Sequence, residues 1–82
     1  MKIRIEEREY EGSGTEIMEQ LRLENEPEEI PDADSYVQYL CANFTRTTGL
    51  ACALPETGVE ERARRMILCL AHAGGLLLLD EN

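Results

Sequence analysis

The sequence predicts a small single α+β domain: an N-terminal strand or hairpin, three helices, and a C-terminal strand that pairs with the N-terminal strand. Three observations predict it. Ile3 and Ile5 alternate with charged residues, which is the period of a strand. Three later segments space their apolar residues as one face of a helix does. Leu76–Leu79 follow two glycines, and four consecutive leucines indicate a strand held in a core or against a second copy of the chain.

The whole chain, residues 1–82, is expected to form one domain. A chain of this length buries only about 60–65% of its unfolded surface, which leaves little room for a deep enclosed pocket. We therefore expect no enzymatic activity, no cofactor and no small-molecule ligand.

Residues 2–11 are open to two interpretations. A turn around residues 6–8 would form a short hairpin and would return Tyr10 to the apolar face that carries Ile3. Without that turn, the segment is one longer strand. The turn contains neither Asn-Gly nor Asp-Gly, so its residues do not decide between the two.

The first helix is predicted to begin after Gly12 and to end near residues 24–25. Ser13 and Glu16 have the spacing of a capping box, in which each side chain binds the free backbone N–H of the other residue. Thr15 is a competing N-cap. The predicted buried stripe is Ile17, Met18 and Leu21.

Residues 25–34 are expected to form an exposed acidic loop. The segment from Glu24 to Asp34 holds six acids, no base, and prolines at positions 27 and 31. Like charges and prolines oppose both helix and strand. The acids lack the spacing of a calcium loop, which favours a solvated loop or a docking strip for a basic partner.

The second helix is predicted to start at Asp32 or Asp34 as N-cap, to run to about Thr47 and to stop at Gly49. Its residues follow the helical spacing on one face, which should lie at the centre of the core. This predicted core face is Tyr36, Val37, Leu40, Cys41 and Phe44. Residues 50–54 form either a short strand or an apolar connection.

The third helix is predicted to begin with a second capping box, Thr57 with Glu60, and to reach about Ala73. Its second half, residues 66–71, is apolar all round, which predicts burial on every side. Leu68 lies opposite the main stripe on this helix. The predicted stripe is Val59, Ala63, Met66, Ile67 and Leu70.

Three cysteines, Cys41, Cys52 and Cys69, are predicted to be free, buried thiols, because their number is odd and no two are closely spaced. With His72 they offer four zinc ligands, but the paired spacing of structural zinc sites is missing, so no metal site is predicted. A catalytic pair of Cys69 and His72 is disfavoured because Cys69 falls in a packed region.

The compartment is expected to be the cytoplasm. The first residues carry no apolar leader, and no apolar run reaches the length of a membrane span. The absence of a disulfide framework agrees with a reducing compartment. No membrane partner is expected.

The net charge of −9 disfavours a nucleic-acid partner, because such binding depends on cationic contacts to phosphate. One alternative stays open. Residues 68–76 resemble the end of a winged-helix recognition helix that runs into its wing, which implies a nucleic-acid regulator. An acidic mimic of nucleic acid is the other form of this alternative. The basic cluster nearby is Arg62, Arg64 and Arg65.

The leading hypothesis is a protein–protein interaction or regulatory module, whose partner is another protein or a second copy of the chain. The third helix and the leucine strand carry more apolar surface than so short a chain is expected to bury. The expected interface residues are Arg64, Arg65, Leu68 and His72.

Overall fold

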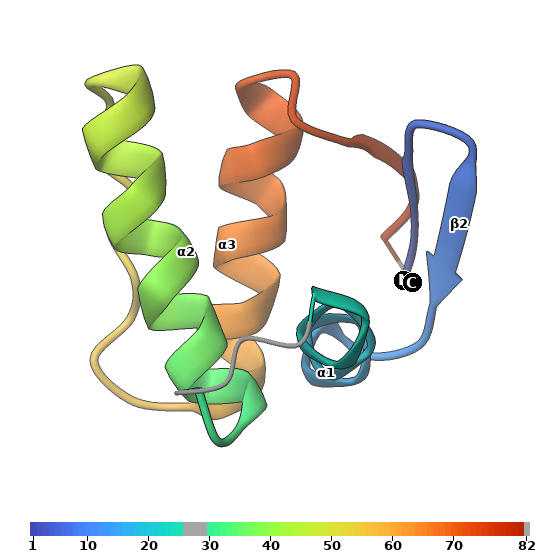
Figure 1. The fold of residues 1–82 in the computed structure, drawn as a ribbon, viewed down its shortest axis with the longest axis horizontal. Coiled ribbons are helices and arrows are strands. Elements are labelled where there is room, and N and C mark those ends of the chain that lie inside the picture. Colours follow the sequence, from blue (N-terminus) through green and yellow to red (C-terminus); the bar gives the residue numbers. More distant parts are fainter. Residues whose placement is uncertain (26–29, 82) are drawn as a thin grey trace.

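The computed structural model describes residues 1–25 and 30–81 as three helices beside a three-stranded antiparallel sheet. In Figure 1, α2 and α3 stand side by side, and α1 lies between this pair and the sheet. The predicted α+β class is confirmed. The elements are β1 (Lys2–Ile5), β2 (Arg8–Glu11), α1 (Gly14–Asn25), α2 (Ala33–Thr48), α3 (Val59–His72) and β3 (Leu77–Asp80).

The N-terminal segment is a hairpin, and the single longer strand is excluded. β1 pairs antiparallel with β2, so that Ile3 lies opposite Tyr10, and both side chains are buried. Glu6 turns the chain with a φ of 56°, a left-handed conformation that costs a residue with a side chain about 1–2 kcal/mol. The turn therefore carries no glycine signal that could have identified it in the sequence.

The leucine-rich segment pairs with β1, as predicted. Leu78 lies opposite Ile3 on the core side, and Leu76, just before the strand, is buried. Leu77 and Leu79 are 54% and 43% exposed. The strand order β2-β1-β3 places β3 at an edge of the sheet. The leucine run therefore divides between core and solvent.

The core lies where the three helices meet the inner face of the sheet. Most of the predicted stripes are confirmed, but Val59, the first residue of α3, is 43% exposed. Leu40 and Leu70 are partly buried and pack against the core. The largest fully buried side chains are Ile3, Ile17, Met18, Val37, Met66 and Ile67.

Both ends of the predicted acidic loop are held by the fold, and residues 26–29 lie outside the described residues. Asn25 is the last residue of α1, and its Nδ2 donates to the Oη of Tyr36 over 3.1 Å. Ile30 is half-buried, and its carbonyl accepts from Nη1 of Arg22 over 3.1 Å. These bonds join α1 to the start of α2.

Two predicted helix caps are confirmed. The Ser13 N–H donates to Glu16 Oε1 over 2.9 Å, and the Glu16 N–H donates to Ser13 Oγ over 3.0 Å. Of the two candidate N-caps of α2, Asp32 is the one used, since its carboxylate accepts from the Ser35 N–H. Gly49 ends α2 with a φ of 74°, which suits glycine.

The second predicted capping box, Thr57 with Glu60, is wrong. The N-cap of α3 is Gly58, and no side chain binds there. Glu60 instead caps α1, because its carboxylate accepts from the Gly14 N–H over 2.8 Å and from the Thr15 N–H over 2.9 Å. Position 14 suits glycine, since an added Cβ would lie 3.0 Å from a backbone nitrogen of α3. One carboxylate thus connects the starts of two helices that are distant in sequence.

We expect the acid stability of the fold to depend on Glu60. Burial raises its pKa, but the hydrogen bonds from Thr15 and Gly14 outweigh burial, so the pKa lies below its usual value of 4.5. A lowered folded-state pKa means that the carboxylate stabilises the fold above the unfolded pKa, and that this stability is lost as the pH falls through the folded pKa. Glu60→Gln should cost about 1 kcal/mol at neutral pH.

Urea unfolding at neutral pH and at several pH values below 4.5 measures this dependence. Glu60→Gln should show a shallower loss of stability in acid than the wild type. Some loss should remain, because a hydrogen bond from Arg62 lowers the pKa of Asp34 in the same direction. The matched control is Glu61→Gln, an exposed neighbour that should behave as the wild type. Parallel pH profiles for wild type and Glu60→Gln would refute the long-range cap.

Candidate functional site

An open groove, which we call the α2–α3 groove, lies between the end of α2 and the second half of α3. Its volume is about 570 Å³. One wall comes from α2 and from the connection that follows it, and the other comes from α3. The lining residues are Phe44, Leu50, Ala51, Arg65, Leu68, Cys69 and His72.

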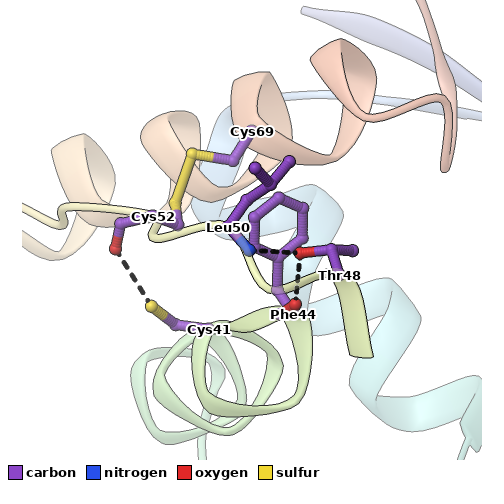
Figure 2. The surroundings of a disulfide bond; sticks show 6 residues. All are labelled: Cys41, Phe44, Thr48, Leu50, Cys52 and Cys69. Atoms are coloured by element: carbon purple, nitrogen blue, oxygen red, sulfur yellow. Dashed lines mark hydrogen bonds between the residues drawn. A yellow bond between two sulfur atoms is a disulfide. The ribbon is translucent and has the colours of Figure 1, made fainter. Parts of the chain in front are cut away.

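The connection after α2 forms the first wall because the helix stops sharply. The Gly49 N–H donates to the Thr45 carbonyl over 2.9 Å. The Leu50 N–H donates to Thr48 Oγ1 over 3.1 Å (Figure 2). Residues 50–54 then continue without regular structure, so they are an apolar connection and not a strand. Leu50 stays 52% exposed at the groove.

A disulfide between Cys52 and Cys69 ties this connection to α3 (Figure 2). The prediction of three free thiols is therefore wrong for these two, and Cys41 is the free cysteine. The pair is 17 residues apart in sequence, so spacing does not identify it, but the fold brings the Cα atoms to 6.2 Å, within the normal range for a disulfide. Disulfides are typical of oxidising compartments. The cytoplasmic location stays a prediction.

Three of the four expected interface residues meet in the groove. Arg65, Leu68 and His72 share one face of α3 because they are three and four residues apart. Arg64 lies elsewhere: its Nη2 donates to the Glu81 carbonyl over 3.3 Å.

Burial on every side of the second half of α3 is not observed. Leu68 is 38% exposed, whereas its neighbour Ile67 is fully buried. The groove also contains residues that the sequence did not single out as functional, namely Phe44, Leu50 and Ala51. Phe44 was predicted only as a core residue, and the sequence signal of Leu50 and Ala51 is that they are apolar and directly follow the glycine that ends α2.

The groove carries a cation that the rest of the described structure does not neutralise. Arg65 has no hydrogen-bond or ion-pair partner within residues 1–25 and 30–81. Arg62, by contrast, binds both carboxylate oxygens of Asp34 over 2.8 and 3.0 Å. With Arg64 also engaged, the basic cluster keeps one unpaired arginine, which is weak support for binding several phosphates.

Zinc binding gains no support from the described part of the chain. No group of three or more His, Cys, Asp or Glu side chains there is placed to hold a metal ion. Two of the four ligands considered, Cys52 and Cys69, are joined to each other.

No helix within residues 1–25 and 30–81 is long and apolar enough to cross a membrane.

Comparisons of the chain with family models, with curated proteins and with solved structures give no match. The geometry and charge of the α2–α3 groove are therefore the features that point to a function.

Proposed function

We propose that this protein is a protein-binding module and that the α2–α3 groove is its binding surface. The occupant is an apolar segment of a partner protein that carries a carboxylate beside its apolar side chain. One observation carries this proposal: Arg65, without a partner among the described residues, stands at an apolar groove in a protein of net charge −9. The groove therefore has an apolar half, which fits an apolar side chain, and a charged half, which fits a carboxylate.

The apolar half supplies affinity. Leu50 and Leu68 are 52% and 38% exposed, and a partner that covers them removes apolar surface from water at about 25 cal/mol per Å². The volume of about 570 Å³ falls in the range of about 300–1,000 Å³ that is typical of ligand pockets. Apolar side chains of a peptide segment therefore fit the groove.

The charged half supplies specificity. Arg65 presents a planar guanidinium that can bind both oxygens of a carboxylate. The acids elsewhere on the chain repel an acidic partner, but salt screens such repulsion beyond about 8 Å. The local contact with Arg65 therefore determines the preference for an acidic segment.

A partner protein is favoured over a second copy of the chain as the occupant. A second copy would bring its own net charge of −9 to the contact, whereas a partner segment needs only the carboxylate that Arg65 binds. A stable dimer that is broken by a change in the groove would replace the partner protein with a second copy as occupant.

The test uses two synthetic amphipathic peptides with the same leucine pattern, one with glutamate and one with glutamine on the polar face. NMR titration of the isotope-labelled protein follows the backbone amides. The glutamate peptide should shift the signals of residues around Phe44, Leu50 and Leu68, and it should bind more tightly than the glutamine peptide. Arg65→Gln should weaken the glutamate peptide about fivefold and leave the glutamine peptide unchanged.

Leu68→Asp should abolish binding of both peptides. The matched control is Leu23→Asp, since Leu23 is 59% exposed on α1 and does not line the groove. Light scattering of the same samples reports dimerisation. Equal affinity for the two peptides would remove the role of Arg65, and shifts confined to other surfaces would overturn the proposed function.

A further inference from the structure

We infer that Cys41, Cys52 and Cys69 form a thiol–disulfide exchange site, in which the disulfide moves between two arrangements: Cys52 with Cys69, and Cys52 with Cys41. The inference stands on the contacts of the three cysteines and does not depend on what occupies the α2–α3 groove.

The free thiol already contacts the disulfide-bonded residue that it would attack. Sγ of Cys41 donates to the carbonyl oxygen of Cys52 over 3.2 Å. In Figure 2, the connection with Cys52 lies between α2, which carries Cys41, and α3, which carries Cys69. Cys52 is therefore placed to bond to either neighbouring helix.

A small adjustment of the connection disturbs few hydrogen bonds. Among the described residues, no backbone–backbone hydrogen bond involves residues 51–57, and the carbonyls of Cys52 and Glu56 accept from the side chains of Cys41 and Arg62. The side chain of Cys52 is short and has three staggered positions about its Cα–Cβ bond. Rotation about that bond, with a small shift of the connection, turns Sγ of Cys52 from α3 toward α2.

The exchange balances without any outside oxidant or reductant. The Cys41 thiol gives its proton to water or to a buffer base, and the resulting thiolate attacks Sγ of Cys52. The bond between Cys52 and Cys69 breaks as the bond between Cys41 and Cys52 forms. Cys69 leaves as a thiolate and takes up a proton. One disulfide and one thiol are present before and after the reaction.

Chain entropy leaves both arrangements accessible. The present disulfide joins residues 17 positions apart, and Cys41 and Cys52 are 11 positions apart. The probabilities that the unfolded chain closes loops of these two lengths differ by only about twofold. Cys69 is half-buried and lines the α2–α3 groove, so the exchange would expose a free thiol there.

The test is disulfide mapping of the oxidised wild type. The protein is incubated at mildly alkaline pH, its free thiol is labelled with a limiting amount of N-ethylmaleimide, and the labelled cysteine is identified by mass spectrometry after digestion in acid. Both Cys41 and Cys69 should carry label, in shares within about tenfold of each other. The shares should not change with protein concentration, since the exchange occurs within one chain.

A second arm uses Cys69→Ser with oxidised glutathione. This variant should form an internal disulfide between Cys41 and Cys52, whereas Cys41→Ser should keep the disulfide between Cys52 and Cys69. Circular dichroism checks that both variants fold. If one variant does not fold, the labelling of the wild type alone decides whether the disulfide exchanges. Label confined to Cys41 in the wild type would overturn the inference, as would shares that change with protein concentration.

Discussion

Replacing Ile67 with alanine is expected to lower the free energy of unfolding by about 3 kcal/mol. Ile67 is fully buried on the core side of α3. Alanine removes three carbon atoms from that position, so the protein loses both their burial and the contacts across the cavity that they leave. A domain of this size has a total stability of only about 4–12 kcal/mol, so urea unfolding followed by circular dichroism measures the change easily.

Leu68→Ala is the matched control, because it shortens the next residue of the same helix. Leu68 is 38% exposed, so its loss should cost about 1.5 kcal/mol, about half of the loss expected for Ile67. Equal losses for the two variants would mean that Leu68 is covered in solution, and the prediction would then fail. A dimer in light scattering would identify the cover as a second copy.

Removing the disulfide is the other change with a large expected effect. The double variant Cys52→Ser/Cys69→Ser should be about 3 kcal/mol less stable than the oxidised wild type. The cross-link closes a loop of 17 residues and restricts the unfolded chain, which is the main source of its stabilisation. Adding dithiothreitol to the wild type should lower its unfolding midpoint to a similar extent.

Two single variants serve as controls for this prediction. Cys41→Ser keeps the disulfide and should lose less than about 1 kcal/mol. Cys69→Ser, treated with oxidised glutathione, should lose less than the double variant if Cys41 and Cys52 then pair. A wild-type midpoint that does not respond to dithiothreitol would contradict the cross-link itself.

The parts of the fold that the sequence predicted correctly depend on interactions between residues close in the chain. The capping box of Ser13 and Glu16, the cap at Asp32 and the stop at Gly49 each involve partners three or four residues apart. The buried stripes followed the helical period for the same reason. The pairing of β3 with β1 is a long-range exception, predicted because four consecutive leucines indicate a segment with side chains in the core, as Leu76 and Leu78 are here.

Predictions failed where a side chain binds a partner that is distant in the sequence. Glu60 has the spacing to bind Thr57, yet its carboxylate binds the amides of Gly14 and Thr15. Cys52 and Cys69 carry no spacing signal, because a disulfide depends on spatial distance and not on sequence separation. Only the packing of α3 against α1 and the connection brings these groups together.

The candidate site shows the same division. The sequence by itself determined that Arg65, Leu68 and His72 share one face of a helix, because the helical period places residues three and four apart side by side. Only the tertiary structure decided that Phe44 and Leu50 face them across a groove, and that Arg64 points away from it toward Glu81. A helix face follows from local backbone geometry, whereas a groove needs two walls, and the second wall comes from a segment whose position depends on how α2 packs against α3.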